Sequence, residues 1–145
     1  MADPEADAQI YFLTREQVVA IHREAIHRYS PSESINIVNS PALESAVSQP
    51  RASWGGQHLY RSIADMAAAY LVGLVQNHAF ENGNKRVGFA AASIFLRMNG
   101  FQLVLTDAEA IELTLKVATG DMSREDVTGT LEKSITELRG ALPSS

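Results

Sequence analysis

Apolar side chains recur with a helical period along most of the chain. Each periodic segment follows a residue that commonly caps a helix, and several segments end at glycine or proline. We therefore predict six helices, over residues 15–29, 41–47, 63–78, 84–98, 107–119 and 124–138. Their predicted N-caps are Thr14, Ser40, Ser62, Asn84, Thr106 and Ser123.

Two stretches depart from this helical period. Residues 48–60 contain Trp54-Gly55-Gly56, the only tryptophan beside the only Gly-Gly pair, which predicts a structured turn or a hairpin. Residues 101–105 are mostly apolar, favour β-structure and are too short for a helix. The segment 84–98 is apolar on nearly all sides, so we predict that it forms the buried central helix. The sequence thus predicts an all-α fold, a compact bundle of about six helices with a small β element.

Composition narrows the class of protein. With 145 residues and 46% hydrophobic side chains, we expect one domain over residues 11–139, an acidic disordered leader over 1–10 and a flexible tail over 140–145. The 12 basic and 17 acidic side chains give a net charge of −5, which argues against general binding to nucleic acid or to a membrane surface. Cysteine is absent and no apolar run has the length of a membrane span, so we expect a cytoplasmic protein without disulfides.

The stretch from His78 to Arg86 concentrates reactive and charged groups between two long apolar segments. It holds a titratable imidazole, a Gly-Asn turn and the cations Lys85 and Arg86. Gly83 can adopt a positive φ without strain, so the simplest path leaves one helix at His78 and enters the next at Asn84 or Lys85. The N–H groups that open the second helix then face the loop. Together with the two cations they form a site suited to an anion such as phosphate.

Several other residues have a simpler structural explanation. His22 and His27 have no chemical partner nearby in the sequence, and we interpret both as surface or rim side chains. A tryptophan beside glycines, such as Trp54, is more often a packing anchor than a functional side chain. His58 needs no role beyond hydrogen bonding within its loop. Phe80, an aromatic residue between two helix ends, is predicted to fasten the turn to the core.

The pattern His-x-Phe-x-Asn-Gly-Asn-Lys-Arg over residues 78–86 resembles the signature of the Fic/Doc family. Lys85 stands where the Fic branch usually has Gly, which matches the Doc (death-on-curing) branch. Other segments that resemble the Doc-type framework are residues 40–46, 54–56 and 95–100. The similarity covers roughly residues 12–115 and implies the same compact all-α fold. The residues that would form the family's target-holding β flap are Trp54, Gly55 and Gly56.

Family members transfer part of a nucleotide to a hydroxyl side chain of a target protein, and the resemblance implies the same groups here. His78 would be the general base that takes the proton of the attacking Ser or Thr hydroxyl, because an imidazole accepts a proton at neutral pH. Lys85 and Arg86 would stabilise the charge that develops on the transferred group. The residues that would bind the nucleotide phosphates are Asn82, Gly83, Asn84, Lys85 and Arg86.

The resemblance to the Doc branch also implies which group is transferred. In that branch the γ-phosphoryl group of ATP or another nucleoside triphosphate goes to the target, a translation elongation factor. The implied function is a toxin that phosphorylates a protein. Fic-type AMP transfer and a catalytically weak module that binds only a nucleotide or a partner are the alternatives. A third alternative is a plain Gly-Asn turn with two solvated cations.

Two further features of the sequence concern the metal and the partner. Asn82 stands where the family commonly has a carboxylate that holds Mg²⁺, and its neutral amide oxygen is a weaker ligand, with Glu81 as a neighbouring donor. The family's internal inhibitory pattern, Ser/Thr-x-x-x-Glu-Gly/Asn, is nowhere complete, because Ser45 and Lys133 break its two partial matches. The resemblance therefore implies a separate antitoxin protein that docks a helix in a hydrophobic groove.

Overall fold

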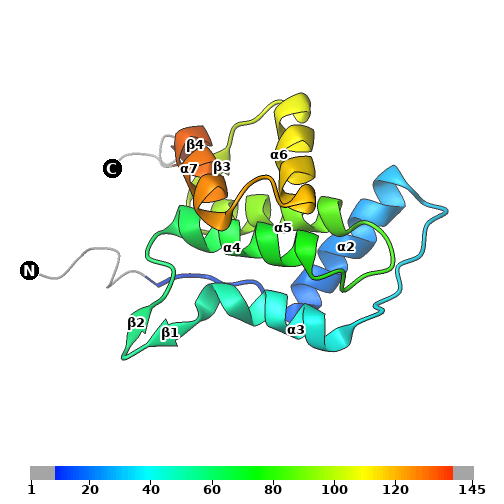
Figure 1. Cartoon of the computed structure of the whole chain (residues 1–145), viewed down its shortest axis with the longest axis horizontal. Helices are drawn as coiled ribbons and strands as arrows, with labels where there is room; N and C mark the ends of the chain where they lie inside the picture. The colour runs from blue at the N-terminus through cyan, green and yellow to red at the C-terminus, as the bar shows by residue number, and fades with distance from the viewer. Residues whose placement is uncertain (1–8, 139–145) are drawn as a thin grey trace, which may run out of the picture.

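The computed structural model describes residues 9–138, which form six α-helices, one 3₁₀ turn and two small two-stranded sheets (Figure 1). The helices are α2 (Arg15–Tyr29), α3 (Ser40–Ser48), α4 (Ile63–Gln76), α5 (Asn84–Met98), α6 (Asp107–Thr119) and α7 (Arg124–Ser134), and the 3₁₀ turn is η1 (Gln49–Arg51). The strands are β1 (Ser53–Trp54), β2 (Gln57–His58), β3 (Phe101–Leu103) and β4 (Ile135–Glu137). The predicted all-α bundle is confirmed. The predicted tail over 140–145 and most of the predicted leader over 1–10 lie outside the described residues.

Helix starts agree well with the prediction because capping is a local interaction. Thr14, Thr106 and Ser123 each form a reciprocal capping box with the third residue of the following helix. Ser62 caps α4 by accepting a hydrogen bond from the N–H of Asp65. The prediction of Ser40 as a cap is wrong, since the side chain of Asn39 accepts from the N–H of Ala42.

Two predicted helix ends are wrong. Helix α4 ends at Gln76, so His78 lies beyond the helix and not on its apolar face. Helix α7 ends at Ser134, four residues before the predicted end at Leu138, because residues 135–137 pair as β4 with β3 in an antiparallel sheet. That sheet joins segments more than 30 residues apart, which a local hydrophobic period does not indicate.

Helices α4 and α5 form the centre of the bundle. Helix α4 contacts α3, α5, α6 and α7, and its side chains are buried along most of its length (Figure 1). Helix α5 packs closely on α4 at Gly88, where a Cβ atom would lie 2.6 Å from Val75 Cγ2 and 3.1 Å from Leu71 O. None of the helices formed by residues 9–138 has the length and apolarity of a membrane-spanning segment.

The hairpin of β1 and β2 stands out from the bundle at the lower left of Figure 1. Its turn uses positive φ at Gly55 and Gly56, as the Gly-Gly pair predicts. The side chain of Trp54 is 81% exposed, so the interpretation of this residue as a packing anchor is wrong. No described contact buries it because the two-residue strands project away from the core.

The close approach at Gly88 yields a stability prediction with an internal control. We expect Gly88→Ala to destabilise the fold by about 1–3 kcal/mol, because the added methyl group overpacks the contact between α4 and α5. Gly129→Ala in α7, where a Cβ atom meets nothing within 4 Å, should instead stabilise the fold by about 0.5–1 kcal/mol. Chemical denaturation measures both values. Equal changes in the two variants would contradict the tight packing of α4 on α5.

Candidate functional site

The loop between α4 and α5 carries the predicted motif and is fastened to the preceding α2–α3 loop. Backbone hydrogen bonds of 2.8 to 3.1 Å join residues 79–81 to residues 36–39. Phe80 pairs with Ile37 in an antiparallel bridge. Both loops meet at the right of Figure 1, at the end of α4 that lies away from the hairpin. The motif is therefore held by a partner segment about 40 positions earlier in the sequence.

Phe80 and Asn84 give this loop its shape. The ring of Phe80 is 2% exposed, which confirms that it fastens the turn to the core. The side-chain amide of Asn84 donates to Phe80 O at 2.9 Å, and its oxygen accepts from Phe80 N at 3.2 Å. The prediction that Asn84 is the N-cap of α5 is therefore wrong. Gly83 holds that position with φ 79°. The Asn84 side chain thereby closes the loop, and its backbone N–H meets no acceptor within residues 9–138.

His22 is buried beside the motif, so its interpretation as a surface or rim side chain is wrong. Its side chain is 1% exposed and its ring stacks on Phe80, with centroids 3.7 Å apart and planes 10° apart. Its Nε2 lies 2.6 Å from the carbonyl oxygen of Asn82, so Nε2 carries the proton and donates it. Burial lowers the pKa of His22, while the hydrogen bond to Asn82 opposes that shift and nearby Arg23 adds to it. Burial therefore favours the neutral form of the ring.

Helical spacing could have placed His22 inside. Position 22 shares a face of α2 with Val18, Ala25 and Ile26, all of which are buried. His27 lies on the opposite, exposed face, so its interpretation as a surface side chain is confirmed. The prediction for His22 is wrong because it rested on the lack of a chemical neighbour in the sequence, whereas burial follows from the apolar neighbours one helical turn away.

His78 lies at the start of the loop with its side chain exposed. It is the one residue other than glycine within residues 9–138 that has a positive φ, at 51°. A side chain with a Cβ atom rarely adopts this conformation, and such strain is concentrated at functional sites. Since residues 79–81 are fixed by backbone hydrogen bonds, the strained turn directs an accessible imidazole away from the core.

The N-terminus of α5 lies at the other end of the loop and lacks a side-chain cap. The other α-helices within residues 9–138 all begin with a side-chain cap. The first helical N–H to find an acceptor is that of Val87, which donates to Gly83 O at 2.9 Å. The preceding N–H groups carry the positive end of the helix dipole and have no partner in the helix. This arrangement favours an anion.

The two cations of the motif differ in how they are held. Arg86 is exposed, but its guanidinium donates to Ser30 Oγ and lies 5.2 Å from the ring centre of Tyr29. Both contacts come from the end of α2, so they fix the direction of the Arg86 side chain. Lys85 is exposed and makes no side-chain hydrogen bond or ion pair within residues 9–138. Lys85 thus offers a mobile charge and Arg86 an oriented one.

The donors for a metal ion are sparse. Residues 9–138 contain no cluster of three or more His, Asp or Glu side chains that could hold a cation. Asn82 is half-buried and uses its backbone carbonyl to bind His22, which leaves its amide oxygen for a ligand. Glu81 is exposed and lies 3.5 Å from the amide of Asn36. Asn82 and Glu81 suit Mg²⁺ only if the ion arrives bound to nucleotide phosphates. Phosphate and water then supply most of its oxygen ligands.

The hairpin with Trp54, Gly55 and Gly56 is not brought next to the motif. It precedes α4, whereas the motif follows α4, and a helix of 14 residues spans about 20 Å. His58 of the hairpin contacts Phe12, whose ring stacks with Phe95 near the C-terminal end of α5. The segment that does lie beside the motif is the α2–α3 loop, where Ile35 and Val38 are exposed.

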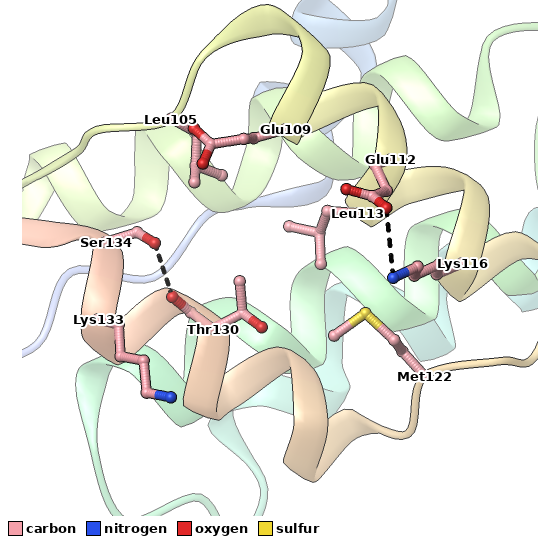
Figure 2. Close-up of a pocket in the computed structure, with 9 residues that line it drawn as sticks. All are labelled: Leu105, Glu109, Glu112, Leu113, Lys116, Met122, Thr130, Lys133 and Ser134. Carbon is pink, nitrogen blue, oxygen red and sulfur yellow. Dashed lines mark hydrogen bonds and ion pairs between the residues drawn. The ribbon is translucent and has the colours of Figure 1, made fainter.

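A separate cavity of about 270 Å³ lies between α6 and α7 and contains no residue of the motif. Figure 2 shows the apolar side chains of Leu113 and Met122 beside it, with charged groups around them. Glu112 and Lys116 form an ion pair of 3.4 Å on its rim. The cavity holds no strained residue and no buried titratable side chain, so the candidate site remains the α4–α5 loop.

The sequence model of the Fic/DOC family matches residues 12–96, more than half of the chain, so the protein belongs to this family. Among its relatives, Toxin Doc of Mycolicibacterium smegmatis is 41% identical over 91 residues, covering 61% of this chain and 70% of the relative. Protein kinase doc of Escherichia phage P1 is 31% identical over 124 residues, covering 83% of this chain and 93% of the relative. The predicted resemblance to the Doc branch is confirmed.

The geometry at the start of α5 predicts how the two cations contribute to anion binding. Arg86→Ala and Lys85→Ala should each weaken ATP binding about tenfold or more, because a charge-assisted hydrogen bond contributes about 1.5–3 kcal/mol. The loss should shrink as ionic strength rises. Isothermal calorimetry at two salt concentrations measures this effect. Arg97→Ala, an exposed arginine in the last turn of the same helix, is the matched control and should bind like the wild type. Unchanged affinity in both motif variants would support a plain turn with solvated cations.

Proposed function

We propose that the protein is a Doc-like toxin that transfers a phosphoryl group from a nucleoside triphosphate to a Ser or Thr hydroxyl of a target protein. The single observation that carries the proposal is the pairing of an exposed, strained His78 with the uncapped start of α5 across one short, fastened loop. The printed names of the two relatives, a toxin and a protein kinase, support it. The phosphate-binding residues would be Asn82, Gly83, Asn84, Lys85 and Arg86.

In the proposed reaction His78 is the general base. Its imidazole takes the proton of the target hydroxyl, and the hydroxyl oxygen forms a bond to the γ-phosphorus. The bond between the γ-phosphorus and the β–γ bridging oxygen breaks, and the nucleoside diphosphate leaves with that electron pair. The proton on the imidazole then passes to solvent. The open position of His78 leaves room for a protein substrate.

The start of α5 would stabilise the negative charge on the phosphates. The backbone N–H groups of Gly83, Lys85 and Arg86 provide fixed donors that need no rearrangement during the reaction. Arg86, already directed by Ser30 and Tyr29, would contact a phosphate through two N–H groups, while Lys85 would follow the transferred group as a point charge.

Mg²⁺ would be held by the nucleotide phosphates and by the amide oxygen of Asn82. When bound, it would neutralise phosphate charge. Asn82 is suited to this task by position, because its carbonyl is fixed by His22 and its side chain is left free. A neutral amide ligand implies that the ion depends on the nucleotide for most of its coordination.

Lys85 also bears on the orientation of the nucleotide. Its side chain and charge stand at the mouth of the loop, so we propose that the γ-phosphate lies nearest His78 and is the transferred group. AMP transfer, the alternative reaction, requires the α-phosphate at that position. The sequence offers no complete internal inhibitory motif, so a separate antitoxin protein is the proposed partner. A protein of translation, such as an elongation factor, is the proposed target.

The hairpin is the part of this proposal that the geometry favours least. Trp54, Gly55 and Gly56 would hold the target main chain from the far end of α4, about 20 Å from His78. A target protein that is bound there and also phosphorylated at the loop must therefore span the length of α4. A folded domain has that reach, whereas a short peptide of a few residues does not.

The proposal predicts which phosphate of ATP is transferred and by which side chain. The protein, incubated with a nucleotide-depleted cell extract and ATP labelled at the γ-phosphate, should label a protein on Ser or Thr. His78→Ala should lower the rate of labelling about a hundredfold to ten-thousandfold, the usual contribution of a general base. Phosphoamino-acid analysis and autoradiography measure both outcomes.

The matched control is His27→Ala, an exposed histidine outside the site, which should label at the wild-type rate. ATP labelled at the α-phosphate should give no labelled protein. Label from the α-phosphate would mean AMP transfer and would refute the assignment to phosphoryl transfer. Full activity of His78→Ala would refute its role as the base.

A further inference from the structure

His22 is a fully buried polar side chain that the proposed reaction does not use. It belongs to α2 and stacks on Phe80. Its Nε2–H donates a hydrogen bond to one atom of the motif, the carbonyl oxygen of Asn82. Filling this part of the core does not require an imidazole, because an apolar ring of similar size would fill the same space. The contact with Asn82 indicates a second role.

The hydrogen bond fixes the orientation of one peptide group. The Asn82–Gly83 peptide is trans, so its C=O and N–H point in opposite directions. Because the C=O points toward His22 in the core, the Gly83 N–H points away from it. Within residues 9–138 no acceptor meets that N–H. It therefore joins the unpartnered N–H groups at the start of α5.

This peptide group would rotate easily without His22. Gly83 has φ 79° and no Cβ atom, so the opposite peptide orientation costs it little. A flipped peptide would aim the Asn82 carbonyl oxygen at the anion site and repel a phosphate. Gly83 is also packed on α2, since a Cβ atom there would lie 2.8 Å from Ile26 Cδ1 and 3.3 Å from His22 Nε2.

We infer that His22 is a positioning residue of the nucleotide site: through its Nε2–H it holds the Asn82–Gly83 peptide so that the Gly83 N–H faces the phosphates. The inference rests on the proposed function of the loop in binding a nucleotide. Stacking on Phe80 fixes the ring plane, and burial keeps water from replacing the Asn82 carbonyl as its partner.

Two amide substitutions separate the hydrogen bond from the packing. His22→Gln places an N–H donor at the position of Nε2, whereas His22→Asn places its donor one bond short of it; both lose the stacked ring. We expect ATP affinity of His22→Gln close to that of the wild type. His22→Asn should bind about tenfold or more weakly, because one donor to a charged phosphate is lost. Isothermal calorimetry with ATP gives both values.

His22→Phe tests the same point with the ring retained. It keeps an aromatic ring on Phe80 but has no donor, so we expect ATP affinity as weak as that of His22→Asn. The Asn82 carbonyl loses its partner in both variants, and the retained ring should make His22→Phe the thermally more stable of the two. His27→Gln, on the exposed face of α2, is the control and should match the wild type in both measurements. In the wild type, NMR of the His22 ring should show a slowly exchanging proton on Nε2.

The outcomes distinguish this inference from the function on which it rests. A wild-type protein that binds no ATP refutes both. If the wild type binds ATP but the Gln, Asn and Phe variants bind equally well, His22 does not position the loop. Affinity that falls only in step with thermal stability, or a wild-type ring without a proton on Nε2, likewise refutes the inference and leaves the proposed function intact.

Discussion

The site depends on the burial of Phe80 in a loop that must turn between two closely packed helices. Burying that ring carries the adjoining polar backbone into the core, where each group needs a partner. Asn84 supplies both partners for the backbone of Phe80, and residues 36–39 pair with its neighbours. His22 covers the ring and binds the carbonyl of Asn82. One apolar anchor thereby determines the backbone path of the whole motif.

The same network explains why the reactive groups are the ones left on the outside. Once the inward-facing atoms of the loop are paired, the groups without partners in the described chain include the His78 imidazole, the Asn82 and Lys85 side chains and the first N–H groups of α5. The chain carries a net charge of −5, yet Lys85 and Arg86 stand at this positive helix end. A local anion site inside an acidic protein favours a small phosphate ligand over a long polyanion.

The sequence predicted what local physics determines and missed what distant contacts determine. Helix starts at Thr14, Ser62 and Thr106 follow from side chains a few positions away, and the motif itself is contiguous. The early end of α7 depends on pairing between β3 and β4, and the path of the motif depends on the α2–α3 loop. The role of His22 lies between these cases, because its spacing to Val18 and Ile26 indicates burial but its partner Asn82 is 60 positions away.

The geometry of the motif implies that an anion binds where the loop meets the start of α5. The most direct measurement is a titration of the ¹⁵N-labelled protein with ATP, followed by the amide NMR signals. The largest shifts should occur at Gly83, Lys85 and Arg86, whose N–H groups lie at the start of α5. Largest shifts at Leu113 and Met122, beside the cavity between α6 and α7, or no shifts at all, would contradict it.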